Sequence, residues 1–311
     1  MKKYFGLMIL LVATLTVTAC GTKKEKKIED GKLNIVTSFY PMYDFTKNVT
    51  KDKANVSMLI DGGVEPHDYE PSAKDMAKIQ EADIFIYNSN EMETWVETVL
   101  KNIDTKKVKV VEASKGIELL TGSHDEEEDG HEGHDHSGIH DPHVWLNPKL
   151  ASKEVTTIYQ AIIETDDKNK EFYEKNKKEY TEKLNELDKD YETVFKGAKN
   201  RKFVTQHTAF SYLAHEYKLE QVAISGISPD QEPTPKELKG IEDFVKNENI
   251  KIIYTESSAS PKIAKTISSA TGAELEVLNP MESVPEKDRK NGVDYLSIMT
   301  SNLEALKKTI K

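Results

Sequence analysis

The sequence predicts an α/β protein of two lobes, each a mostly parallel four-stranded sheet with flanking helices, joined by one long backbone helix. Short runs rich in Val and Ile alternate with helical segments in both halves of the chain, and this alternation is typical of parallel sheets covered by helices. Between Pro148 and Gly197 there is neither glycine nor proline, which favours long helices there. The chain has 311 residues, enough for two lobes at roughly 100–200 residues per domain.

The N-terminus has the pattern of a secretory signal. Two lysines precede an apolar run from Phe5 to Val17, which is shorter than the ~20 residues that a membrane-spanning helix needs. Residues 1–19 are therefore predicted to be a signal peptide. The sequence Val17-Thr18-Ala19-Cys20 resembles a bacterial lipobox and contains the only cysteine, so we expect lipidation of Cys20. Residues 20–31 are polar and Lys-rich, as in a flexible tether. The mature protein is then expected outside the cytoplasm, lipid-anchored to the outer face of the cell membrane.

Composition excludes several classes of protein. The formal net charge is −11, whereas nucleic-acid-binding proteins present basic surfaces. A single cysteine excludes a disulfide framework and a Cys-rich zinc module. The acidic balance suits a small cationic ligand, and it suits an ordinary soluble protein equally well.

An N-terminal lobe is expected over residues 32–150. Its β-rich runs predict four strands, and the segments between them predict two helices. The expected strands are Leu33–Phe39, Asn55–Ile60, Asp83–Tyr87 and Lys107–Glu112, and the expected helices are Ser72–Ala82 and Glu91–Lys101.

Residues 122–140 interrupt this pattern. The segment has seven acidic residues and no hydrophobic periodicity, so we expect a mobile loop. It also contains five histidines, namely His124, His131, His134, His136 and His140.

Residues 151–198 are expected to form a linking helical region. A helix over Lys153–Glu164 should end at Thr165-Asp166-Asp167, and a longer one should follow over Glu171–Phe195. Apolar residues of the second helix recur at spacings of three, four and seven, which predicts one buried stripe. A coiled-coil partner for this stripe is the alternative interpretation.

The C-terminal lobe is expected over residues 199–311, where the alternation resumes. Its expected strands are Lys202–Gln206, Leu219–Ser225, Ile250–Thr255 and Glu274–Leu278, and its expected helices are Phe210–Tyr217, Thr234–Asn247, Pro261–Thr271 and Thr300–Thr309.

Three histidines follow predicted strands or lie in the long loops after them. His67 comes after the second strand, His143 after the fourth and His207 directly after the fifth. Ligands of open α/β sheets bind at the carboxyl ends of strands, so these imidazoles predict a metal site. Glu282, just past the last strand, is the candidate fourth ligand, and Glu256 is the weaker alternative.

Around these residues the chain resembles a known family. The motifs are Pro66–Ser72, Asp141–Pro148, His207–Leu213 and Leu278–Glu282, together with the acidic His-rich loop. They resemble the metal-binding lipoproteins of bacterial ABC importers, specifically the zinc-type members of the cluster A-I solute-binding proteins. The resemblance covers essentially the whole mature chain.

The resemblance implies two α/β lobes around a rigid backbone helix, with the metal between them. It implies ligation by His67, His143 and His207, with Glu282 as the fourth ligand. The implied function is capture of Zn²⁺, as the transported ligand, and delivery to a membrane permease that works with an ATPase. We expect a monomer. We also expect no enzyme activity, because four protein ligands leave no open position on the metal for a catalytic water.

Two alternatives and one accessory role stay open at this point. Manganese-type relatives carry a carboxylate where His207 stands, and three imidazoles suit zinc better than the oxygen-rich sites that manganese prefers. A surface adhesin is the second alternative. The histidines of residues 122–140 are expected to collect zinc with low affinity and pass it inward.

Overall fold

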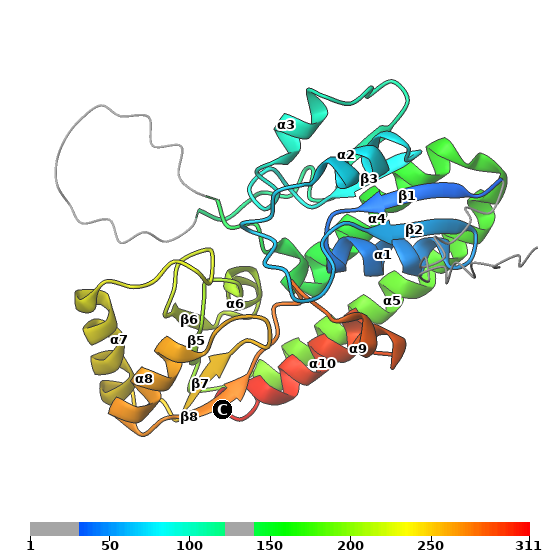
Figure 1. Ribbon diagram of the computed structural model, residues 1–311. Helices are drawn as coiled ribbons and strands as arrows, with labels where there is room; N and C mark the ends of the chain where they lie inside the picture. Colours follow the sequence, from blue (N-terminus) through cyan, green and yellow to red (C-terminus); the bar gives the residue numbers. More distant parts are fainter. Residues whose placement is uncertain (1–30, 122–139) are drawn as a thin grey trace, which may run out of the picture.

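The computed structural model describes residues 31–121 and 140–311, in which two parallel four-stranded sheets lie on either side of a long helix (Figure 1). The first sheet has the strand order β2-β1-β3-β4, and all neighbours run parallel. Its central strand β1 places Ile35 beside Val56 of β2 and Ile84 of β3. The four strands are β1 (Leu33–Thr37), β2 (Ala54–Met58), β3 (Ile84–Tyr87) and β4 (Lys109–Glu112).

The second sheet repeats the topology of the first. Its order is β6-β5-β7-β8, again with parallel neighbours throughout. The predicted two-lobed α/β fold is therefore confirmed, with strands a few residues shorter than some of the expected ranges. The strands are β5 (Lys202–Thr205), β6 (Glu220–Ala223), β7 (Ile252–Thr255) and β8 (Glu274–Val277).

Three helices of the first half surround its sheet. α1 (Tyr40–Thr50) has no counterpart in the expected elements, and it buries Phe45 and Val49 completely. α2 (Ala73–Gln80) begins at a capping box formed by Ser72 and Asp75. In Figure 1, α2 and the short α3 (Val96–Leu100) lie above the first sheet, and α1 lies below it.

α3 is shorter than the predicted helix, and the reason lies in the segment that precedes it. The sequence predicts a helix over Glu91–Lys101, but α3 begins only at Val96. The Glu93 carboxylate accepts hydrogen bonds from the backbone amides of Asn88 and Ser89, at 2.9 and 3.0 Å. These bonds fold the chain into a turn ahead of the helix.

The linking region consists of α4 (Pro148–Thr165), a single 3₁₀ turn at Asp167–Asn169, and α5 (Lys170–Phe195). A second 3₁₀ turn, Val144–Leu146, leads into α4. The predicted stripe of α5 is buried, and α5 contacts α1, α4 and α10 of the same chain. The stripe is therefore buried against helices of its own chain. The alternative interpretation expected it to pack against a coiled-coil partner instead.

The second half carries five helices among the described residues. α10 begins five residues before the expected Thr300, because Asp294 and Ser297 form a capping box there. The five residues of α9 were not expected. The helices are α6 (Ser211–Tyr217), α7 (Pro235–Asn247), α8 (Lys262–Thr271), α9 (Glu286–Lys290) and α10 (Tyr295–Leu306).

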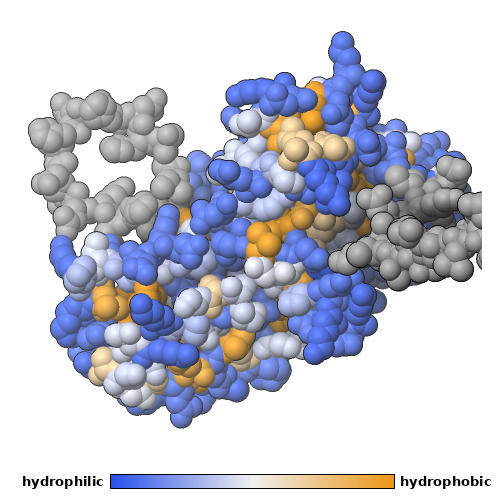
Figure 2. All heavy atoms as spheres, viewed as in Figure 1, coloured by the Kyte–Doolittle hydropathy of each residue, from blue (hydrophilic) through white to orange (hydrophobic). Residues whose placement is uncertain are grey.

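The face shown in Figure 2 is mostly hydrophilic, with small hydrophobic patches, and the two ends of the chain differ in how much of them the structure describes. Among residues 31–121 and 140–311, no helix combines the length and apolar character needed to cross a membrane. The signal peptide 1–19, Cys20 and the tether to residue 30 lie outside the described residues, as do His124, His131, His134 and His136. His140 is described, and it forms an isolated antiparallel bridge with Thr121.

Candidate metal centre

Side chains that follow four different strands meet between the two sheets. Each offers one ligand atom, and these atoms all lie within 4.8 Å of one another. The structure therefore brings together every side chain expected at the site, two from each half of the chain. They are His67 after β2, His143 after β4, His207 after β5 and Glu282 after β8.

Glu282 lies at the centre of this group. Its Oε1 atom is 3.0 Å from Nε2 of His143, 3.1 Å from Nε2 of His207 and 3.5 Å from Nε2 of His67. The Nε2 atoms of His143 and His207 are 3.3 Å apart. Zinc–nitrogen bonds of about 2.0–2.1 Å in a tetrahedron place neighbouring ligand atoms about 3.3–3.4 Å apart. The observed spacings are close to this value.

Two carboxylates stand behind the histidines. Asp141 Oδ1 lies 2.8 Å from Nδ1 of His143, and Glu256 Oε1 lies 2.6 Å from Nδ1 of His207. A carboxylate on Nδ1 fixes the proton there and turns the Nε2 lone pair toward a metal, an arrangement common at metal sites. The structure thus places Glu256 behind His207, while Glu282 faces the Nε2 atoms.

Unpartnered polar atoms in the cluster suit the binding of a cation. Nε2 of His67 and the second oxygen of Glu282 are buried and make no hydrogen bond. When Nδ1 carries the ring proton, the Nε2 atoms of His143 and His207 direct lone pairs at a carboxylate oxygen. Buried polar atoms rarely stay unpaired, and a cation among them would satisfy all of these acceptors at once.

The charges in this group shift its proton equilibria. Burial opposes a charge on His207, but Glu282 and Glu256 hold the pKa of its imidazole well above the usual value. Burial lowers the pKa of His67. Burial also opposes ionisation of Glu282, but the facing histidines hold the pKa of this carboxyl well below its usual value. Because imidazole nitrogens bind a metal only when they are deprotonated, metal binding at this site competes with proton binding.

A strained turn delivers Glu282. Met281 has φ = 62°, in the left-handed region that a long side chain rarely adopts. Its backbone amide donates to Asn279 Oδ1 at 2.8 Å, and Trp145 Nε1 donates to the carbonyl of Pro280 at 2.8 Å. These bonds hold the chain in the reversal that directs Glu282 toward the histidines.

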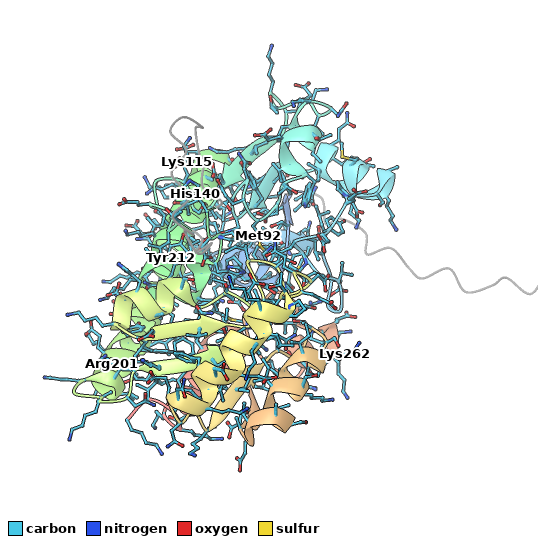
Figure 3. The ribbon with its side chains drawn as sticks, turned by 90° about the vertical axis from the view of Figure 1, so that its left-hand side faces the viewer. Met92, Lys115, His140, Arg201, Tyr212 and Lys262 are labelled. Carbon is cyan, nitrogen blue, oxygen red and sulfur yellow. The ribbon has the colours of Figure 1, made fainter. Side chains whose placement is uncertain are left out.

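The segment before His143 is held from both lobes. Asn88 Nδ2, at the end of β3, donates to the carbonyl of Pro142 at 2.9 Å. The Tyr212 hydroxyl, from α6, donates to the carbonyl of Asp141 at 2.6 Å. Figure 3 shows Tyr212 close to His140, where the chain enters this segment.

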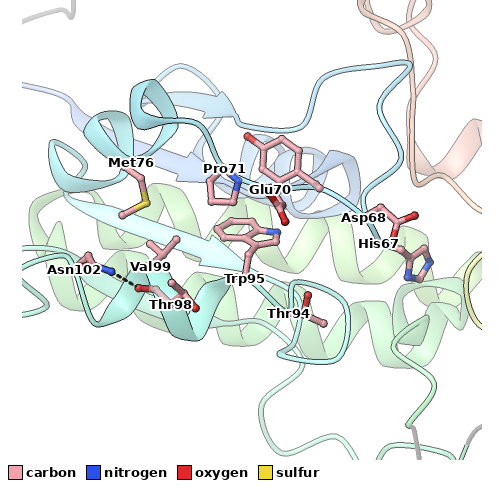
Figure 4. A pocket seen from close by; sticks show the side chains of 11 residues that line it. His67, Asp68, Glu70, Pro71, Met76, Thr94, Trp95, Thr98, Val99 and Asn102 are labelled. Atoms are coloured by element: carbon pink, nitrogen blue, oxygen red, sulfur yellow. Dashed lines mark hydrogen bonds between the residues drawn. The ribbon is translucent and has the colours of Figure 1, made fainter.

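A groove of about 610 Å³ opens beside His67. Figure 4 shows Trp95 in its middle, with Pro71 close to the indole and His67 at one end. Of the four clustered side chains, His67 is the one that lines this groove.

Other candidate residues lie away from the cluster. His215 is exposed on α6, which begins four residues after His207, and it is not part of the cluster. A second acidic group lies at Asp188, Glu192 and Glu216, but Lys149 Nζ contacts all three carboxylates at 3.6, 3.0 and 2.6 Å. The lysine ammonium therefore occupies the space between the three carboxylates and offsets one of their negative charges.

Curated relatives of this chain carry zinc-related names. The chain is 50 % identical over 313 residues to the high-affinity zinc uptake system protein ZnuA of Bacillus subtilis (strain 168), covering 99 % of this chain and 98 % of that protein. It is 49 % identical over 312 residues to the zinc-binding lipoprotein AdcA of Streptococcus pneumoniae (strain ATCC BAA-255 / R6). That alignment covers 99 % of this chain and 61 % of AdcA.

Solved structures give the same picture. The Zn(II)-bound ZnuA-like domain of Streptococcus pneumoniae AdcA matches with a TM-score of 0.77 and 48 % identity, over 90 % of this chain and 99 % of that one. The laminin-binding protein Lmb of Streptococcus agalactiae, described as a bifunctional adhesin and metal transporter, matches with a TM-score of 0.79 and 40 % identity, over 90 % and 100 % of the chains. A family model described as zinc-uptake complex component A, periplasmic, matches residues 35–309. This chain therefore belongs to the family of zinc-uptake complex component A, as the sequence motifs led us to expect.

Proposed function

We propose that this protein is the extracytoplasmic zinc-binding component of an ABC importer, which captures Zn²⁺ between its two lobes and passes it to a membrane permease with its ATPase. The observation that carries the proposal is the cluster of three imidazoles and one carboxylate at tetrahedral spacing. Membership of the zinc-uptake family supports the same function.

The ligand set proposed for Zn²⁺ is His67, His143, His207 and Glu282. Zinc prefers about four nitrogen, oxygen or sulfur ligands in a tetrahedron, whereas manganese prefers oxygen-rich sites of higher coordination. The nitrogen at position 207 therefore favours zinc, and the manganese alternative receives no support from the donor set. Four protein ligands also favour capture over catalysis, in keeping with a family of binding components.

Delivery requires the ligands to separate. His67 and His143 belong to the first half of the chain, and His207 and Glu282 to the second. A movement between the halves, or of one ligand-bearing loop, would break the site without chemistry. Contact with the permease is proposed to drive this movement.

The chain ends and the histidine segment complete the proposal. Lipidation of Cys20 would anchor a monomer to the outer face of the cell membrane, through residues 21–31 as a tether. The histidines of residues 122–140 would raise the local zinc concentration beside the site. Deletion of residues 122–140 should then slow uptake at scarce zinc and leave the affinity of the cluster unchanged.

Adhesion is the second candidate function, and the observation for it is the similarity to Lmb; the zinc-uptake family and the zinc-related relatives favour import instead. Growth of a deletion strain separates the two functions. A strain lacking an importer should need added zinc, whereas a strain lacking only an adhesin should not.

The decisive experiment is zinc titration against a competing chelator, using mature protein without residues 122–140. We expect one tight equivalent, lost when His207 is changed to Ala. His215→Ala is the matched control, because His215 is exposed on the next helix and should leave binding unchanged. Weak binding by the unmodified protein, or equal binding by both variants, would overturn the proposal.

A further inference from the structure

Two loops from opposite halves of the chain touch beside the metal centre. One loop follows β2 and leads to His67, and the other follows Glu282 and leads into α9. We call their contact the latch. It consists of Asp61, Gly62 and Gly63 on the first loop and Ser283, Val284, Pro285 and Arg289 on the second.

Hydrogen bonds and one ion pair cross the latch. The backbone amide of Gly63 donates to Ser283 Oγ at 2.5 Å. Arg289 donates through Nη2 to Asp61 Oδ1 across the latch at 2.8 Å, and through Nη1 to the carbonyl of Val284 on its own loop at 2.6 Å. The Arg289 guanidinium also lies over the ring of Tyr43, 5.8 Å from its centroid, so it contacts α1 as well.

Gly62 permits the closest approach of the two loops. A Cβ atom at this position would lie 2.5 Å from Cα and 2.8 Å from the nitrogen of Pro285. Both are backbone atoms, which do not rotate away as a side chain does. The φ angle of Gly62 is not in the left-handed region, so glycine is needed here for space and not for backbone conformation.

The latch lies close in sequence to two of the proposed metal ligands. Ser283 follows Glu282 directly, and Gly63 precedes His67 by four residues. Residues 61–64 are exposed, whereas Glu282 is buried. Opening the latch would therefore let the His67 loop move into solvent while Glu282 stays fixed.

We propose that this latch holds the His67 loop against Glu282 and sets the rate at which bound zinc leaves. The proposal rests on the proposed zinc-binding function and adds the contact that regulates it. Its residues act through His67 and are positioning residues, since none of them belongs to the cluster of ligand atoms.

The contacts of the latch should differ in how much each one slows zinc release. The Asp61 side chain is 62 % exposed, so water screens its ion pair, and Asp61→Asn should speed zinc release less than about fivefold. Ser283→Ala removes one hydrogen bond and should speed release about two- to tenfold. Gly62→Ala forces backbone atoms apart only in the closed arrangement, and should speed release about tenfold to a hundredfold.

The test measures zinc release into excess chelator by stopped flow, with zinc association and metal-free thermal unfolding measured on the same samples. The mature protein without residues 122–140 is used throughout. Gly62→Ala should release zinc faster while association and metal-free unfolding stay close to the unmodified protein. Ser283→Ala gives the same test without a steric clash, in case Gly62→Ala folds poorly.

Matched controls separate the latch from a general defect. Gly240→Ala places a methyl group in open space on α7, and Lys290→Ala removes an exposed ion pair within α9. Both should release zinc at the unmodified rate. If Gly62→Ala and Ser283→Ala also release zinc at that rate, the latch is wrong although zinc binding stands. If the unmodified protein binds zinc weakly, the proposed function fails first.

Discussion

His143 and His67 reach the same cluster from the same sheet, yet their surroundings differ sharply. His143 is fully buried, its Nδ1 contacts Asp141, and the neighbouring Trp145 is completely enclosed. His67 lies at the end of a groove, on a loop whose residues 61–64 are exposed. One proposed ligand is built into the core, and the other is carried by a surface loop.

The difference teaches how one site can be tight and still release its cargo. A ligand fixed by core packing needs no reordering when the metal binds, so it adds affinity. A ligand on a loop with few buried contacts can leave at low cost, because such segments open locally. We therefore assign affinity chiefly to the His143 side and exchange chiefly to the His67 side. Four predictions test this division.

The largest expected effect is on zinc affinity when His143 is changed to Ala. Zinc binding by a four-ligand protein site yields about 10–16 kcal/mol, so one ligand accounts for about 2.5–4 kcal/mol, or a factor of about 100 to 1,000 in Kd. His67→Ala should cost less, because water at the groove edge can take the vacant position. Chelator competition measures both. A larger loss for His67→Ala would reverse the comparison.

The second prediction concerns the scaffold behind His143, where burial raises the pKa of Glu93 to about 7. Its carboxylate holds the amide of Asn88, whose side chain in turn holds Pro142. A carboxyl whose pKa is raised on folding stabilises the protein fully only below its unfolded pKa of about 4.3. That stability is lost as pH rises toward 7 and amounts to about 3–4 kcal/mol.

Glu93→Gln removes this titration and keeps a similar shape. The free energy of unfolding of the metal-free protein is measured in urea at pH 4.5 and at pH 8. Between these two pH values, the unmodified protein should lose about 3–4 kcal/mol more than the variant does. The comparison between the two pH values cancels the constant cost of the altered hydrogen bonds. An identical difference at both pH values would show that Glu93 has an ordinary pKa.

The third prediction concerns the carboxylate behind His143. Asp141→Asn keeps the size of the side chain but no longer fixes the Nδ1 proton by charge, so zinc affinity should fall about 10- to 100-fold. Glu256→Gln should act similarly on His207, because Glu256 lies at a comparable distance from its Nδ1. Glu65→Gln is the control for loss of a charge near the cluster, since the half-buried Glu65 accepts from the backbone amide of His67 and contacts no Nδ1 atom. Equal losses in all three variants would contradict an orienting role.

The two sides also differ in how far the sequence predicted them. Histidines at strand ends are local features, and parallel strands bring His67 and His143 to one edge of the first sheet. Their meeting with His207 depends in addition on how the two halves face each other. Asp141 stands two residues before His143, and this spacing was an available signal for its contact with Nδ1. Glu256 lies 49 residues from His207 and was expected as a weaker fourth ligand. Its place behind the ring depends on side-chain direction, which the element order does not specify.

The unexpected elements have physical reasons as well. In α1, Pro41 and several β-branched or aromatic residues weaken the helical pattern, and burial of Phe45 and Val49 supplies the stabilisation instead. The latch could not be predicted either, because the closeness of Gly62 to Pro285 spans more than 200 residues and leaves no periodic trace.

The smallest expected effect tests whether packing from the second lobe reaches the zinc site. The Tyr212 hydroxyl accepts from the amide of Leu120 at 2.9 Å and donates to the carbonyl of Asp141 at 2.6 Å. Tyr212→Phe should lower the free energy of unfolding by about 1–2 kcal/mol and weaken zinc binding a few-fold, because the His143 segment loses a support.

Tyr254→Phe is the matched control for this variant. Its hydroxyl is also buried and donates to the carbonyl of Ala305 at 2.8 Å, within the second half and away from the cluster. It should lose a similar free energy of unfolding with no change in zinc affinity. Chemical unfolding and chelator competition on both variants decide the question. If Tyr212→Phe changes stability alone, the His143 segment is held by its own lobe, and the rigidity of this side does not depend on the contact between lobes.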